Sequence, residues 1–126
     1  MTVGRGSAVI LGAAAIVLMV VVFHCGVAEA ATYTVGDDGG WSFFVSGWPQ
    51  GKRFEAGDVL VFKYNPSFHN LVKVNEAGYN ECTTPSGSKF YRSGKDQIKL
   101  VKGQNYFICS IPGHCLAEMK ISVNAV

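Results

Sequence analysis

The pattern of apolar and polar positions divides the chain into one long apolar run and a series of short strand-like segments. Residues 8–23 form an uninterrupted apolar run without a charged residue. Beyond residue 30, apolar positions alternate with polar ones or gather in short runs of branched and aromatic side chains, a pattern typical of β-strands. The predicted strands cover residues 32–35, 58–64, 70–75, 97–101, 104–109 and 119–123.

Turn-forming residues separate these segments. Glycines and aspartates at positions 36–40 end the first strand, and Asn65-Pro66-Ser67 ends the second. The polar stretch 75–93 predicts one short helix near residues 76–81. Several short strands at this spacing predict an all-β fold, a small antiparallel Greek-key β-sandwich of one domain.

The first 30 residues predict a secretory signal peptide. Arg5 precedes the apolar run, and Ala28-Glu29-Ala30 matches the small-x-small pattern of a cleavage site. A membrane anchor is the alternative, because the run is close to the shortest length that spans a bilayer. The abrupt change to strand-like sequence at Ala31 favours cleavage, so we expect residues 31–126 to form a secreted, extracellular domain.

The net charge of this domain and the residues at its C-terminus indicate which kinds of partner it can have. No second apolar run follows residue 30 and the C-terminus is not hydrophobic, so we expect no membrane anchor in the mature chain. The formal net charge of +2 is unchanged by cleavage, because Arg5 and Glu29 leave together. The basic residues are spread along the chain and form no stripe with exposed aromatics. We therefore expect the domain not to bind nucleic acid. We also expect it to be a monomer.

The number of cysteines indicates that one of them has a role other than in a disulfide. Cys25 leaves with the signal peptide, and Cys82, Cys109 and Cys115 remain. In an oxidising compartment, three cysteines indicate one disulfide and one thiol with another role.

A metal site accounts for the third cysteine. Cys109, His114 and Met119 follow one another at intervals of five residues across a turn, and His69 begins an earlier predicted strand. Two imidazoles, a thiolate and a weak axial thioether are the ligands of a type 1 (blue) copper site. Zinc also accepts two histidines and a cysteine, but methionine is a poor zinc ligand, so the pattern favours copper.

Copper binding by Cys109 would decide the disulfide. The pairs Cys82–Cys109 and Cys109–Cys115 would both destroy the site, which leaves Cys82–Cys115. Two neighbouring residues have further predicted roles. Asn70 could tie the two ligand loops together through its amide and direct its backbone N–H at the Cys109 sulfur. His114 is expected to face solvent and to serve as the point of electron entry.

The sequence resembles the phytocyanin family, in particular its plantacyanin or basic blue protein branch. The resemblance rests on ATYTVGDDGGW at residues 31–41, GKRFEAGDVLVFKYNPSFHN at 51–70 and GKDQIKLVKGQNYFICSIPGHC at 94–115, and it extends over essentially the whole mature chain. It implies a cupredoxin sandwich, a location in the apoplast or cell wall, and one type 1 copper. The family's ligand positions fall on His69, Cys109, His114 and Met119, and its disulfide on Cys82 and Cys115.

Two functions are compatible with these features. The first is single-electron transfer by Cu(I)/Cu(II) cycling, with an unidentified redox partner that docks near His114. The second, which the resemblance also implies, is extracellular signalling or cell-wall interaction, such as pollen guidance, in which copper is structural or incidental. An enzyme is not expected, because the chain has neither a Ser/His/Asp nor a paired-carboxylate signature. Trp41, Trp48 and Phe43 are expected to pack rather than to carry electrons.

Overall fold

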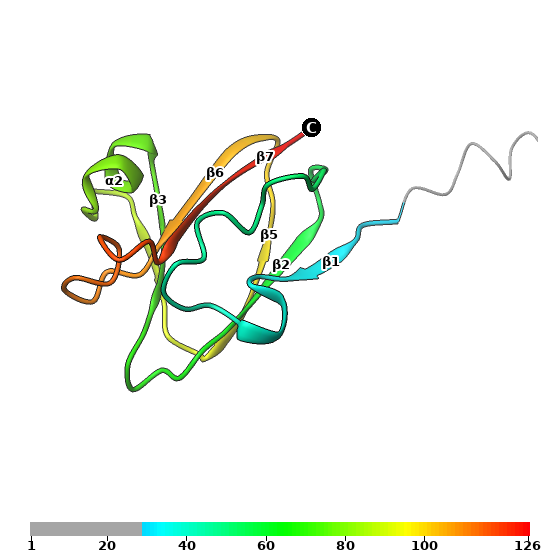
Figure 1. Ribbon diagram of the computed structural model, residues 1–126. Helices are drawn as coiled ribbons and strands as arrows, with labels where there is room; N and C mark the ends of the chain where they lie inside the picture. The colour runs from blue at the N-terminus through cyan, green and yellow to red at the C-terminus, as the bar shows by residue number, and fades with distance from the viewer. Residues whose placement is uncertain (1–28) are drawn as a thin grey trace, which may run out of the picture.

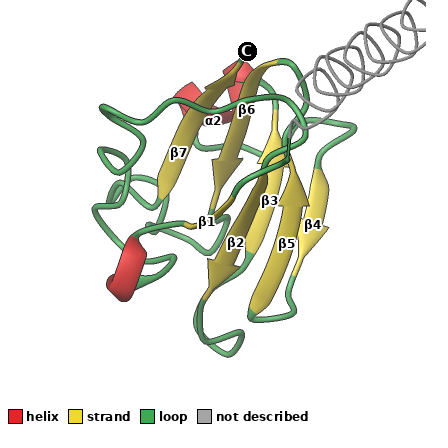
Figure 2. Cartoon of the chain, turned by 90° about the vertical axis from the view of Figure 1, so that its right-hand side faces the viewer, coloured by secondary structure: helices red, strands yellow, loops and turns green. Residues whose placement is uncertain are grey.

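The computed structural model describes residues 29–126 and contains two β-sheets (Figure 1). Seven strands lie in this part of the chain: β1 (Thr32–Thr34), β2 (Val59–Lys63), β3 (Leu71–Val74), β4 (Lys89–Tyr91), β5 (Lys95–Lys99), β6 (Gly103–Ile108) and β7 (Lys120–Ala125). One sheet has the order β1-β2-β5 and the other β4-β3-β6-β7 (Figure 2). The predicted all-β sandwich is confirmed.

The pairing and the number of the strands differ from the prediction. Strands β1 and β2 pair in parallel, whereas the sequence pattern predicted antiparallel pairing throughout. Parallel pairing needs a long crossover connection, and the irregular segment between β1 and β2 provides it. Strand β4 was not predicted, because its three residues in a polar region are too few to show an alternating pattern.

The short helix α2 (Glu76–Glu81) confirms the helix that was predicted in the polar stretch. Asn75 begins it, because its side-chain oxygen accepts a hydrogen bond from the backbone N–H of Gly78 at 2.8 Å. A second short element, the 3-10 helix η1 (Asp37–Gly39), follows β1. Helix α2 packs beside β3 and β6.

Alternation along β3 places its side chains on two faces. Leu71 joins the core between the sheets, whereas Val72 and Val74 join a smaller cluster with Ile108 and Cys115. Tyr79 of α2 packs against this smaller cluster. The sheet is therefore covered on both faces, and its strands can be apolar on both sides.

The core between the sheets leads towards the predicted metal residues. Its largest fully buried side chains include Trp41, Phe62 and Phe107, and the same cluster contains Cys109 and Met119. No helix among residues 29–126 has the length and apolar character needed to cross a membrane. The predicted signal peptide lies almost entirely outside the described residues.

Candidate metal centre

Three of the predicted ligands meet at one end of the sandwich. The side-chain donor atoms of His69, Cys109 and His114 all lie within 4.8 Å of one another. The two histidines face each other through Nδ1 at 3.1 Å, and the Cys109 sulfur lies 3.5 Å from His114 Nδ1. The sequence alone did not tell which ring nitrogen faces the site; the structure assigns Nδ1 in both rings.

Cys109 and Met119 are positioned by the sheet. Cys109 follows the last residue of β6 and Met119 precedes the first residue of β7, two antiparallel neighbours. The backbone N–H of Cys109 donates to the Met119 carbonyl at 3.0 Å and extends the ladder by one step. Both side chains are completely buried. The thiol and the thioether therefore have positions that the core determines.

His114 is held by the turns that join β6 to β7. Gly113 adopts a left-handed backbone with φ of 82°, which the predicted Pro112-Gly113 turn requires. The His114 N–H then donates to the Ile111 carbonyl, and its own carbonyl accepts from the Met119 N–H at 3.1 Å. These bonds return the chain to the site, so His114 and Met119 approach it from the same loop.

His69 is held by the turn that follows β2. The Asn65 side-chain oxygen accepts from the Ser67 N–H at 2.9 Å, and the Asn65 carbonyl accepts from the His69 N–H at 3.0 Å. Asparagine favours this kind of side-chain turn, and Pro66 prevents the strand from continuing. His69 is thereby placed two residues before β3, beside the end of β6.

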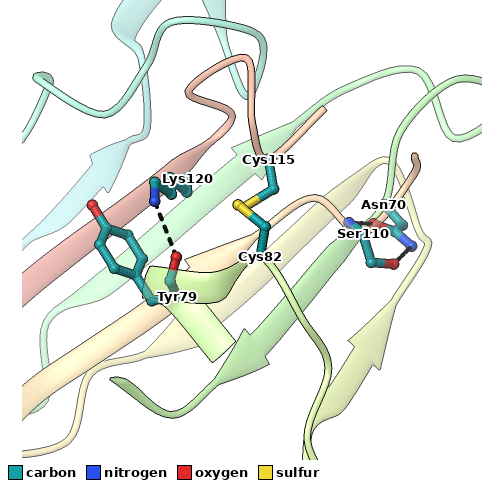
Figure 3. The surroundings of a disulfide bond; sticks show 6 residues. All are labelled: Asn70, Tyr79, Cys82, Ser110, Cys115 and Lys120. Carbon is teal, nitrogen blue, oxygen red and sulfur yellow. Dashed lines mark hydrogen bonds between the residues drawn. A yellow bond between two sulfur atoms is a disulfide. The ribbon is translucent and has the colours of Figure 1, made fainter. Parts of the chain in front are cut away.

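Asn70 connects the two ligand loops. Its amide nitrogen donates to the Ser110 hydroxyl and its amide oxygen accepts from the Ser110 N–H, both at 2.8 Å (Figure 3). The Asn70 N–H is directed at the Cys109 sulfur, 3.5 Å away. A donor at this place lowers the electron density on a thiolate, which tunes a metal bound to it.

Two aromatic residues contribute contacts that the sequence did not reveal. The Trp41 indole N–H donates to the Asn70 carbonyl at 2.9 Å, so this buried side chain supports the ligand segment as well as the core. The Phe43 ring lies edge-on to both histidines, with centroids 5.4 Å from His69 and 4.8 Å from His114. Neither residue belongs to a metal motif, so only the folded chain brings them to the site.

The predicted disulfide Cys82–Cys115 is confirmed (Figure 3). It joins the end of α2 to the residue next to His114, and Cys109 is left as a free, buried cysteine. The bridge spans a sequence separation of 33 residues. A loop of this length contributes about 3–4 kcal/mol of stability in the chain-entropy model. The disulfide thus restrains the loop that carries His114.

The electrostatics favour a neutral imidazole at His69. Burial lowers the pKa of His69 below its usual value, and the nearby His114 lowers it further. Neutral imidazole is the form that donates a lone pair to a metal ion. The soft sulfur donors, the two imidazoles and the buried position together fit copper, and His69, Cys109, His114 and Met119 are arranged as in a type 1 copper site.

Sequence and structure comparisons relate the chain to known blue copper proteins. Residues 33–119 match the family model described as a plastocyanin-like domain. The chain is 56% identical to chemocyanin of Lilium longiflorum over 99% of both sequences, and 56% identical to basic blue protein of Arabidopsis thaliana over the full length of both. Among solved structures, it resembles cucumber basic protein, a blue copper protein, with a TM-score of 0.75 and 61% identity over 76% of this chain and all of the other.

These similarities extend well beyond the ligand residues. Spinach plantacyanin gives a TM-score of 0.69 and 56% identity over 76% of this chain and all of that structure. The chain therefore belongs to the plastocyanin-like (phytocyanin) family of blue copper proteins. The resemblance to the plantacyanin and basic blue protein branch is confirmed.

Proposed function

We propose that this protein is a secreted, single-electron carrier whose type 1 copper is bound by His69, Cys109, His114 and Met119. The observation that carries the proposal is the convergence of the donor atoms of His69, Cys109 and His114 within 4.8 Å, together with a fully buried Met119. Copper bound there supplies a one-electron Cu(I)/Cu(II) couple. The predicted signal peptide supports secretion.

The surroundings of the donor residues suit electron transfer. Cys109 and Met119 are held by the core and by backbone hydrogen bonds, so their positions change little between oxidation states. A site that does not rearrange has little structural cost when its charge changes. The chain supplies four donors of its own, which favours a carrier over an enzyme that must bind substrate at an open metal position.

Exposed apolar side chains near the two histidines along the chain support docking of a redox partner near His114. Phe68 precedes His69 and is 63% exposed, and Leu116 follows His114 by two residues and is 80% exposed. Phe43, 41% exposed, is in T-shaped contact with both rings. A partner that buries these side chains would approach the half-buried histidines while water is excluded.

A visible absorption spectrum tests the proposal. Residues 31–126 loaded with Cu(II) should show an intense blue thiolate-to-copper band and should be reduced and reoxidised reversibly. The Cys109→Ser variant should lose the band completely, because it lacks the thiolate, while the Cys82–Cys115 disulfide stays intact. A colourless wild-type protein that prefers zinc would overturn the proposal.

A further inference from the structure

Two lysines lie directly opposite each other at one side of the four-stranded sheet. Lys73 of β3 is paired in register with Lys89 of β4. Side chains opposed in this way have Cβ atoms roughly 4.5–5.5 Å apart, and like charges at such positions destabilise a sheet. Lys73 lies between Val72 and Val74, which are both buried in the smaller cluster, so β3 cannot shift its register without exposing them. The fold therefore retains this repulsion, and a bound anion would relieve it.

Both lysines line one surface pocket with a volume of about 250 Å³. The other residues that line it are Val74, Asn75, Ser86, Gly87 and Ser88, so its described lining includes two cations and no carboxylate side chain. Asn75 uses its amide oxygen to begin α2, which leaves its amide nitrogen to offer a ligand. The lining is therefore rich in hydrogen-bond donors.

The environment of Lys73 agrees with an anion site. Its side chain is half-buried, and burial together with the charge of Lys89 lowers its pKa below the usual value for lysine. An anion between the two ammonium groups would raise the pKa of Lys73 again, because it stabilises the charged form of each lysine.

A second opposed pair provides a contrast within the same molecule. Lys63 of β2 and Lys95 of β5 are also paired in register. Lys63, however, lines a pocket that includes Asp37 and Asp38. The chain itself thus places carboxylates in the pocket that Lys63 lines, whereas the described residues that line the pocket of Lys73 and Lys89 provide none.

We propose that Lys73 and Lys89 form a binding site for an oxyanion group, such as a phosphate, sulfate or carboxylate, with Asn75 and Ser86 as further donors. A water molecule takes up about 30 Å³ of liquid, so the pocket has room for a group with several oxygens. The site shares no residue with the metal centre. It stands independently of the proposed electron transfer.

Amide NMR spectroscopy of the copper-loaded protein, kept in its reduced form, tests this site. Sodium phosphate, sulfate and acetate are titrated separately, with sodium chloride at matched ionic strength as the reference. We expect saturable shifts of the amides in residues 73–75 and 86–89 with at least one oxyanion and not with chloride. Comparing the titration with acetate to those with phosphate and sulfate shows whether the site prefers carboxylates or tetrahedral anions.

Charge-removing variants complete the test. Lys73→Gln and Lys89→Gln should each weaken binding by about tenfold or more, since each removes a charged hydrogen-bond donor. Lys63→Gln and Lys95→Gln remove the same charge from the other pair and should leave binding nearly unchanged. Equal weakening by all four variants, or shifts that follow ionic strength alone, would show general charge screening and overturn the proposal.

Discussion

Two of the four proposed copper ligands lie in the core, and two lie on loops at its edge. Cys109 and Met119 are completely buried at the ends of paired strands. His69 and His114 are half-buried, and each is positioned by turns. The site thus has one half whose geometry the sheet determines and one half that solvent can reach.

The two halves are stabilised by different interactions. The buried half depends on packing in the apolar core, which responds steeply to any change of volume. The loop half depends on a small number of discrete contacts: the Asn70–Ser110 hydrogen bonds, the disulfide next to His114 and the Phe43 ring. Changes in the first half should therefore alter folding most, and changes in the second should alter mainly the properties of bound copper.

The largest effect is expected in the buried half, at Met119. Met119→Ala should lower the free energy of unfolding of the copper-free protein by about 2–5 kcal/mol, because it leaves a cavity in the core. Met119→Leu keeps the volume and should cost less than about 1.5 kcal/mol. Denaturant unfolding measures both.

Loading the Met119→Leu variant with copper then distinguishes the role of Met119 in core packing from its role as a copper ligand. The variant should remain blue and show a higher reduction potential, since the loss of an electron donor disfavours Cu(II). An unchanged potential would contradict the assignment of Met119 as the axial ligand.

A smaller effect is expected where the two ligand loops are joined. Asn70→Ala removes both hydrogen bonds to Ser110 and leaves the Ser110 backbone N–H without its partner. The free energy of unfolding should therefore fall by about 1–3 kcal/mol. Copper transfer to a chelator should also become faster. Ser110→Ala keeps the bond from the Ser110 N–H to Asn70 and should have a weaker effect on both measurements. If Asn70→Ala changes neither copper retention nor reduction potential, Asn70 has no role at the site.

The smallest effect is expected at Phe43. Phe43→Ala removes edge-on contacts to two imidazoles, and because Phe43 is 41% exposed, we expect the free energy of unfolding to fall by no more than about 0.5–1.5 kcal/mol in total. The reduction potential should fall, because water that reaches the histidines stabilises the more highly charged Cu(II). Phe44→Ala is the matched control: it removes the neighbouring ring, which is 80% exposed. Equal shifts in the two variants would show that Phe43 has no special part in shielding the site.

Sequence reasoning succeeded where local chemistry carries the signal. The intervals between Cys109, His114 and Met119 and the odd number of cysteines led to the ligand set and to the disulfide. Strands with branched and aromatic residues were recognised, as was the helix that begins at Asn75. Strand β4 and the parallel pairing of β1 with β2 were missed, because three residues show no period and pairing depends on segments distant in the chain.

The sequence by itself determined the kinds of donor, the fold class and the position of the turns, since each follows from side-chain chemistry and from patterns within a few residues. Only the tertiary structure decided that Nδ1 of both histidines faces the site. It also decided that Trp41 supports Asn70, that Phe43 covers the rings and that Lys73 opposes Lys89. These contacts join residues far apart in the chain, and strand register and core packing bring them together.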